Sequence, residues 1–519
     1  MSELTQKLES THPDYNEWLP RWTKARDFSG GIDPMRAHDL ANWLQGCATI
    51  TYNAAGESSR IRALGATFAS IARGAYILPT SDKMTYTEYV LYLLRGHCPS
   101  YVHLTLSGFL GLIFGNAPDV KLPGADALLT DADLQETPLV EYIEAVLSEV
   151  LLTARYGVLL DSPPVTKDGL TVGDAEREGL RPYMAGYRAE DIRDWADARI
   201  GGRRVATYYK LRERVRRGDG YDYDYRELFL GAEGYYQKYW TREKKDGEYK
   251  DTTIVPLKGG AAMRTIPFYL YSPRGGRREI EATPLADLID LQHEYYQWAV
   301  EFANACFAVG IPTAAFLGFL KEEVEGIVLG GLNGIYSSVP GSDAKYLEFT
   351  GQGLDALAAR GVSILTNIAK FGGRMLTQDK AAAEAEGTVR IRASAESATL
   401  ADMARACSRI TTQMLQEAEE WGFGGGKAVF ELSTDYMDYQ PDPAMLKELS
   451  AMVGANQMAL KDFVAYQKRV NLIPDTRTDA QIMADLEAQK EAGAADAQVK
   501  AENALAQTAA RMGKDKAAA

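Results

Sequence analysis

The sequence predicts an α+β protein that is mainly helical. Long stretches before residue 180 and after residue 283 place apolar residues three and four positions apart, as one buried face of an α-helix requires. Between Arg181 and Tyr271 the period changes to two, which is typical of β-strands with one buried face. Helices and strands that are segregated along the chain in this way favour an α+β fold over alternating α/β units.

The composition is that of a folded and acidic protein. Hydrophobic residues make up 46% and charged residues 25% of the 519 positions, values that exclude global disorder. The formal net charge of −14 argues against a surface that grips nucleic acid over its whole extent, although local basic patches are compatible with it. No apolar run is long enough to cross a membrane and the N-terminus is unlike a signal peptide, so we expect a soluble protein with no membrane partner.

Catalytic and metal-binding motifs are missing from the sequence. His293 and Glu294 begin like a zincin motif, but the second histidine that zinc would need is absent. Gly422–Lys427 resembles a phosphate-binding loop only faintly, because Ala428 stands where Ser or Thr must hold magnesium. We therefore predict that the protein is not an enzyme and holds no metal or cofactor. The cysteines form no CxxC pair, which indicates a reducing compartment; they are Cys47, Cys98, Cys306 and Cys407.

The first third of the chain is expected to be helical. Apolar residues at helical spacing predict helices over Ser58–Tyr76 and Thr85–Leu94. A third helix begins at Thr137-Pro138, where a capping residue precedes a proline at the first helical position. This helix is expected to run to Tyr156 and to lead into a buried strand over Val158–Leu160.

Two neighbouring strands are predicted on either side of the turn Gly218-Asp219-Gly220. Cations alternate with apolar residues in the first strand, and tyrosines alternate with aspartates in the second. Cations interleaved with tyrosines could bind nucleic acid. We favour instead a β-meander in which the cations pair with the aspartates across the short turn, and a second turn at Lys245-Asp246-Gly247 supports it. The alternating residues are Val205, Thr207, Tyr209, Leu211 and Val215 with Lys210, Arg212, Arg214 and Arg216, and then Tyr221, Tyr223 and Tyr225 with Asp222 and Asp224.

The most informative stretch begins at Thr283-Pro284, which repeats the cap-and-proline start of a helix. This helix is expected to run to about Ala308 and to carry its carboxylates on one face, because they are separated by three, four and seven residues. An apolar stripe on a separate face must be buried, so the acidic face meets solvent, either outside the protein or in a channel. The carboxylates are Asp287, Asp290, Glu294 and Glu301, and the apolar stripe holds Leu285, Leu288, Tyr295, Ala299, Phe302 and Cys306.

Beyond residue 308 the sequence predicts loop-rich and helical parts in turn. Glycines punctuate the first part, which indicates a small loop-rich or β-containing module. A polar run between two of the later helices is either a mobile loop or a plain helix–helix connection. The expected order is the module up to Gly353, a helix over Leu354–Phe371, the polar run Gly372–Gly387, a helix over about Thr388–Trp421, a strand over Val429–Leu432, and amphipathic helices after Pro443.

The order of these parts resembles the portal proteins of tailed bacteriophages. Thr283–Pro312 looks like the portal stem helix and its exit toward the clip, and Glu386–Trp421 is similar to the long helix that follows the tunnel loop. Segments nearer the N-terminus look like one portal subfamily, long catalogued as an uncharacterised phage domain. The resemblance covers roughly Trp18 to Ile473 and rests on the ordered set of segments. Those nearer the N-terminus are Tyr76–Pro79, Tyr86–Tyr89, Gly108–Phe114, Gly157–Pro163 and Arg181–Tyr183.

The resemblance implies a homo-oligomeric ring, usually a dodecamer, at one vertex of a virion capsid, assembled in the host cytoplasm. Double-stranded DNA would be packaged and ejected through its axial channel. Its other partners would be the major capsid protein, the large terminase, and then an adaptor or head-completion protein. The implied regions are an N-terminal arm and wing at 1–282 with a β-meander at about 181–271, a stem helix at 283–308, a clip at 309–353, a second stem helix at 354–371, a tunnel loop at 372–387, a long helix and wing strand at 388–442, and a helical crown and tail at 443–519.

Two sets of residues are expected to line the DNA channel of such a ring. The acidic helix face would repel phosphate and keep the DNA mobile, and the tunnel loop would touch the DNA weakly. Two alternative functions stay open, namely another head–tail connector or minor capsid protein, and an enzyme that acts through paired carboxylates. The channel candidates are Asp287, Asp290, Glu294 and Glu301 on the helix and Arg374, Gln378 and Lys380 in the loop.

Overall fold

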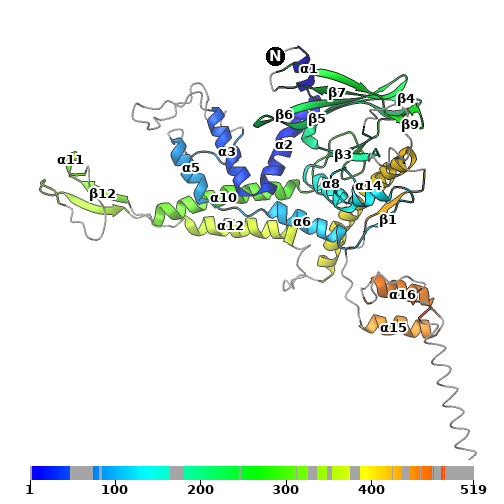
Figure 1. Ribbon diagram of the computed structural model, residues 1–519. Coiled ribbons are helices and arrows are strands. Elements are labelled where there is room, and N and C mark those ends of the chain that lie inside the picture. The colour runs from blue at the N-terminus through cyan, green and yellow to red at the C-terminus, as the bar shows by residue number, and fades with distance from the viewer. Residues whose placement is uncertain are drawn as a thin grey trace, which may run out of the picture. The chain divides into compact units, whose positions relative to one another are not determined.

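Helices and antiparallel sheets both occur, largely in separate parts of the chain (Figure 1), which confirms the predicted α+β class. The chain divides into two compact units, Met1–Asp435 and Tyr436–Ala519. The computed structural model describes residues 3–46, 74–80, 84–163, 180–244, 247–310, 313–324, 336–347, 353–373, 386–422, 425–434, 436, 443–455, 457–469, 472, 481–482 and 484–485.

The largest sheet is an antiparallel meander of five strands that pair in sequence order. Its strands are β4 (Ile192–Ile200), β5 (Arg203–Arg217), β6 (Gly220–Gly231), β7 (Gly234–Thr241) and β8 (Lys250–Ile254). A three-stranded sheet with the order β11-β2-β3 packs against it, where β2 is Tyr156–Asp161, β3 is Tyr183–Arg188 and β11 is Phe268–Tyr271. The two sheets share a core with helix α2 (Pro13–Gly30), and Trp22, Trp195, Leu211 and Phe268 are buried in it.

The predicted pairing of Arg212, Arg214 and Arg216 with the aspartates across the β5–β6 turn is wrong. The register places Arg214 opposite Tyr223, because the short turn brings the cation positions of β5 to the same face as the tyrosines of β6. The guanidinium of Arg214 lies 3.7 Å from the ring centroid of Tyr221. Asp222 lies on the other face, where Arg217 Nη1 and Arg242 Nε donate to it at 3.0 and 2.8 Å.

Lys210 also departs from the predicted pairing of the cations with aspartates. Its side chain is buried, and its Nζ donates to the carbonyl of Lys7 and the hydroxyl of Ser10 at 2.9 Å each. Those acceptors lie at the end of helix α1 (Glu3–Glu9), so Lys210 satisfies a free carbonyl at the helix C-terminus. Burial lowers the pKa of Lys210. Periodicity alone could not show that a helix covers this face of β5.

Helices dominate the chain before the sheets. They are α3 (Ile32–Gly46), α5 (Tyr86–Arg95), α6 (Tyr101–Phe114), α7 (Asp126–Thr130) and α8 (Leu139–Thr153). Helix α5 begins where the sequence predicts, with Thr85 and Glu88 in a reciprocal capping box. Most of the helix predicted over Ser58–Tyr76 lies outside the described residues. Helix α8 ends three residues earlier than expected, because Ala154 adopts a left-handed conformation with φ 60° and the buried strand β2 already begins at Tyr156.

Two antiparallel helices form the second major feature of the first unit. Helix α10 (Ala286–Gly310) packs on α12 (Leu354–Ile368), and α2, α5 and α6 contact other sides of α10 (Figure 1). Gly361 of α12 makes the close approach possible, because a Cβ at this position would lie 2.1 Å from the indole of Trp298. The Nε1 of Trp298 donates to the carbonyl of Leu357 at 2.6 Å. A π-helical turn, Ala369–Gly373, ends the second helix.

The buried side of α10 is broader than the apolar stripe that the sequence predicts. Leu288 and Ala299 are buried as expected, but Phe302 is only half-buried and Cys306 is exposed. Helices pack on more than one side of α10, so its buried face turns toward residues that the predicted stripe left out. These residues are Ile289, Gln292, Tyr296 and Val300.

The chain between and after the paired helices forms smaller elements. Strands β12 (Thr313–Leu317) and β13 (Asp343–Leu347) make an antiparallel hairpin with the short helix α11 (Lys321–Val324) between them. Helix α14 (Glu386–Gly422) buries Met403, Cys407, Ile410 and Met414. Strand β14 (Val429–Glu431) pairs with β1 (Asp119–Lys121), and the second unit contains α15 (Pro443–Gly454) and α16 (Leu460–Arg469).

Substitution of Gly361 by alanine should loosen the contact between α10 and α12. The new methyl group overlaps the Trp298 indole, so we expect a loss of about 1–3 kcal/mol in the free energy of unfolding, measured by denaturant titration. Gly111→Ala in α6 is the matched control, because a Cβ there meets open space and should stabilise an exposed helix by about 0.5–1 kcal/mol. Equal effects of the two variants would contradict the close contact.

Candidate functional site

The four predicted carboxylates of α10 are all at least partly exposed, but two of them have cationic partners. Asp290 Oδ1 lies 2.6 Å from Lys24 Nζ of α2, and Glu294 Oε1 lies 3.5 Å from Arg360 Nη2 of α12. No ion pair within the described residues engages the exposed Asp287 and Glu301. Lys24 of α2 and Arg360 of α12 therefore neutralise part of the acidic face. Its carboxylates without an ion pair among the described residues are Asp287 and Glu301, the first and the last of the four.

The second set of predicted channel residues cannot be placed on the fold. Arg374, Gln378 and Lys380 lie between the π-helical turn and α14, outside the described residues. The structure therefore neither joins them to the acidic face of α10 nor separates them from it. The segment begins after Gly373, the last residue of the π-helical turn.

The module between α10 and α12 exposes an unusual number of large apolar side chains. A two-stranded hairpin is at best marginally stable alone in water, and apolar side chains gathered on one exposed element indicate a surface that another molecule covers. Glu323 accepts hydrogen bonds from Ser338 Oγ, Ser338 N, Leu320 N and Ser337 Oγ, which lower its pKa to about 2. The exposed apolar residues, with their exposed fractions, are Leu317 at 54%, Leu320 at 50%, Val324 at 37%, Tyr336 at 85%, Tyr346 at 59% and Leu347 at 57%.

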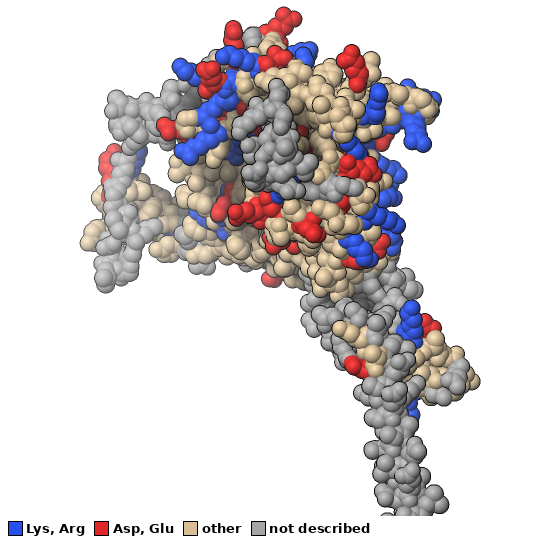
Figure 2. Space-filling view, turned by 45° about the vertical axis from the view of Figure 1, so that its right-hand side comes forward, with Lys and Arg blue, Asp and Glu red and all other residues tan. Residues whose placement is uncertain are grey.

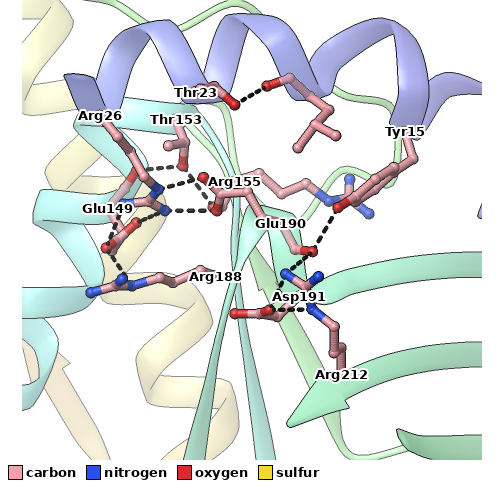
Figure 3. Close-up of polar contacts among 11 residues, drawn as sticks. Tyr15, Thr23, Arg26, Glu149, Thr153, Arg155, Arg188, Glu190, Asp191 and Arg212 are labelled. Carbon is pink, nitrogen blue, oxygen red and sulfur yellow. Dashed lines mark hydrogen bonds and ion pairs between the residues drawn. The ribbon is translucent and has the colours of Figure 1, made fainter. Parts of the chain in front are cut away.

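A polar junction joins the helices to the sheets, and sequence patterns gave no sign of it (Figure 3). Arg26 of α2 lies between Glu149 of α8 and Glu190, with its Nη2 2.8 Å from an oxygen of each carboxylate. Arg212 of β5 binds Asp191 at 2.9 Å, and the hydroxyl of Tyr15 donates to the carbonyl of Glu190 at 2.9 Å. These bonds fix the start of the large sheet to α2 and α8.

A second polar cluster anchors residues 74–80 between α3 and α10. The buried Asp39 accepts bonds from the backbone N–H groups of Tyr76 and Ile77 at 2.6 and 3.2 Å, and from the Tyr296 hydroxyl at 3.1 Å. Burial raises the pKa of Asp39 to about 6, although these bonds oppose the rise. Neighbours in the sequence do not reveal this site, because the partners of Asp39 come from two distant segments.

Two histidines lie beside the Asp39 cluster, and their pKa values are shifted in opposite directions. His38 Nδ1 lies 3.1 Å from Asp27 Oδ2, and this hydrogen bond raises the pKa of His38. His293 Nε2 contacts the carbonyl of Tyr76 at 3.0 Å, and burial lowers the pKa of His293. Among the described residues, no three His, Cys, Asp or Glu side chains come together in a way that could hold a metal ion. His293, the start of the incomplete zincin motif, is part of this anchor.

Comparison with known proteins gives a partial match. A family described as a domain of unknown function (DUF4055) matches residues 284–422, which hold α10, the β12–β13 hairpin, α12 and α14. No curated protein matches the chain. No described helix is long and apolar enough to cross a membrane.

Similar chains occur among solved structures of gene transfer agent (GTA) particles. One is in the neck of the empty particle computed with C6 symmetry, with TM-score 0.38, 13% identity, and coverage of 72% of this chain and 90% of that chain. One is in the virion of the native particle, with TM-score 0.37, 13% identity, and coverage of 84% and 98%. A third is in the neck of the native particle computed with C12 symmetry, with TM-score 0.36, 12% identity, and coverage of 70% and 89%. At such TM-scores, function has to be inferred from the residues of this chain.

The Asp39 anchor should make stability depend on pH. A carboxyl whose folded pKa lies above its unfolded value near 3.9 binds its proton more tightly when folded, so its contribution to stability is lost as pH rises through about 6. Asp39→Asn cannot ionise. We therefore expect the free energy of unfolding of the wild type to fall relative to that of Asp39→Asn, by on the order of 2 kcal/mol between pH 4 and pH 7.

Denaturant titrations at several pH values measure this difference, and Asp33→Asn is the matched control. Asp33 belongs to the same helix, but its side chain is 92% exposed. His293 is unchanged in both variants, so its contribution cancels in the comparison. The charge of Asp39 helps to raise the pKa of His38, so all chains are compared in a His38→Gln background, where this position does not titrate. Parallel pH profiles for the wild type and Asp39→Asn would show that Asp39 is not held as described.

Proposed function

We propose that the protein is a phage portal protein, which forms a ring and conducts double-stranded DNA through its axial channel. The observation that carries the proposal is the exposed apolar hairpin, β12–β13, at the end of the antiparallel pair α10 and α12. The described residues of the first unit leave this surface exposed, and copies of the chain arranged head to tail can cover it at every subunit of a closed ring. The sequence resemblance assigns the hairpin to the clip and the helix pair to the stem.

The charges on α10 agree with a conduit. A channel that bound DNA tightly would retain it, because each Lys or Arg contact with phosphate adds a salt-dependent attraction. Among the described residues, no cation pairs with Asp287 or Glu301, so the face that these two carboxylates share would repel phosphate. In this proposal the ring acts without catalysis of its own, at a vertex of the virion, and the large terminase and adaptor proteins dock on it.

Ring formation is expected to depend on the apolar hairpin. Tyr346→Glu combined with Leu347→Glu places charge on two exposed positions of β13, so it should leave the fold intact but abolish the ring. Tyr346→Phe with Leu347→Met is the matched control, because it keeps the surface apolar and should keep the ring. Mass photometry gives the oligomer and circular dichroism the fold. A wild-type chain that stays monomeric at micromolar concentration would contradict the proposal.

Reversal of the charges of Asp287 and Glu301 on α10 should slow DNA passage. Asp287→Lys with Glu301→Lys removes repulsion without breaking an ion pair among the described residues, unlike substitution of Asp290 or Glu294, whose partners Lys24 and Arg360 would then face a like charge. Exposed charges contribute less than about 1 kcal/mol each, so folding should be retained.

The measurement is the amount of DNA packaged into particles assembled with the variant, at several salt concentrations. The deficit should be largest at low salt, where screening is weakest. Asp219→Lys with Glu233→Lys, at exposed turns of the large sheet, changes the net charge equally and serves as the control. If both double variants package DNA as the wild type does, this face of α10 does not line the channel.

A further inference from the structure

Exposed arginines form a basic surface at one end of the large sheet. We call it the arginine edge and define it as Arg199, Arg203 and Arg204 around the β4–β5 turn, with Arg274, Arg277 and Arg278 in the loop after β11. Five of these are exposed and Arg278 is half-buried. Figure 2 shows Lys and Arg side chains gathered along the right-hand side of the view.

Ion pairs join the turn and the loop into a single surface. Arg204 Nη1 lies 3.5 Å from Glu279 Oε1, and Arg278 Nη1 lies 3.7 Å from Asp197 Oδ2 of β4. The loop is a tight turn in which Gly275 N donates to the Ser272 carbonyl at 3.1 Å. The arginines of both segments are therefore held close together although they are distant in the sequence.

The arginine edge carries more positive charge than its own carboxylates neutralise. Asp197 forms ion pairs with both Arg204 and Arg278, and Glu281 lies 3.5 Å from Arg277. Within the described part of the chain, no ion pair engages the other three cations, Arg199, Arg203 and Arg274. This excess is local, because the chain as a whole has a net charge of −14.

The register of the β4–β5 turn places like charges opposite each other. Arg199 is the direct cross-strand partner of Arg204, and like charges at such positions destabilise a sheet. A local conflict of this kind is expected where function requires the residues. The pair borders a hollow of about 310 Å³, lined also by Asp197, Ala198 and Gly202. Gly201 and Gly202 supply the left-handed backbone of the turn, with φ of 56° and 82°, and open space surrounds both.

We propose that the arginine edge binds the phosphate backbone of duplex DNA, at a surface separate from the acidic face of α10. Every cation of the edge is an arginine, whose planar fork binds phosphate oxygens with two hydrogen bonds. Cations spread over two segments match an extended polyanion better than a single small anion. An acidic protein surface offers carboxylates instead, and the experiment distinguishes it from DNA.

The test measures binding of the full-length chain to a fluorescent DNA duplex by anisotropy over a range of salt concentrations. Arg199→Gln, Arg203→Gln and Arg274→Gln are combined in one variant, which removes the three cations without an ion pair. We expect at least a tenfold loss of affinity at low salt. The slope of log affinity against log salt should also become shallower by about 2–3, since each lost phosphate contact contributes about 0.9.

A matched control removes three cations at the opposite end of the same sheet, through Arg216→Gln, Lys244→Gln and Lys250→Gln. The control should bind DNA with nearly the affinity and salt slope of the wild type. The melting temperature should not fall in the first variant, because Arg199→Gln relieves the repulsion with Arg204.

Equal binding by the two triple variants would overturn the proposal. Binding of the wild type to polyglutamate with no binding to the duplex would overturn it in favour of an acidic protein partner. The assay needs no ring, so its result is distinguishable from failure of the proposed portal function. Replacement of the same three arginines by lysine should restore part of the affinity, since it keeps the charge and removes only the fork.

Discussion

The close contact of Trp298 with Gly361 is the interaction on which the arrangement of the other elements depends. It lets α12 lie against α10 with a hydrogen bond from the indole to the Leu357 carbonyl, while α2, α5 and α6 pack on other sides of the same helix. A helix enclosed in this way has few exposed positions left, and Asp287 and Glu301 occupy two of them. The geometry that stabilises the pair therefore also decides where the free acidic charge of α10 can be.

Polar side chains hold further elements of the first unit in place. Arg26 connects α2 to α8 and to the start of the large sheet, and Asp39 holds residues 74–80 between α3 and α10. Burying charged groups is costly unless they are paired, so such contacts define one arrangement more sharply than apolar packing would. With the core fixed in this way, the exposed apolar hairpin and the arginine edge lie at the surface of the first unit.

The periodicity of the sequence predicted the elements that depend on neighbouring residues. It failed where contacts with distant segments determine whether a side chain is buried or where a helix ends. Helix α5 begins after Thr85 as expected, because its capping box is encoded within four residues. The burial of Lys210 depends on the C-terminal end of α1, where the Lys7 carbonyl and the nearby Ser10 hydroxyl accept hydrogen bonds from its ammonium group. No pattern within β5 encodes these contacts. The early end of α8 at Ala154 escaped prediction because a residue other than glycine adopts the left-handed conformation.

The candidate site was predicted in part for the same reason. The spacing of Asp287, Asp290, Glu294 and Glu301 correctly places them on one helix, whereas the pairing of Asp290 with Lys24 and of Glu294 with Arg360 needs the tertiary fold. Cross-strand register likewise turned the expected arginine–aspartate pairs into arginine–tyrosine contacts. A one-residue difference in the turn would have reversed that outcome, because successive side chains of a strand point to opposite faces.

In the proposed function, copies of the chain close into a ring with α10 around the axis. An electron cryomicroscopy reconstruction of the purified full-length protein can show this arrangement. We expect a closed ring with a central channel, with Asp287 and Glu301 facing the axis and the β12–β13 hairpin of each subunit covered by its neighbour. A ring in which these carboxylates face outward would contradict the channel assignment, and a preparation of compact monomers with exposed hairpins would contradict the portal function itself.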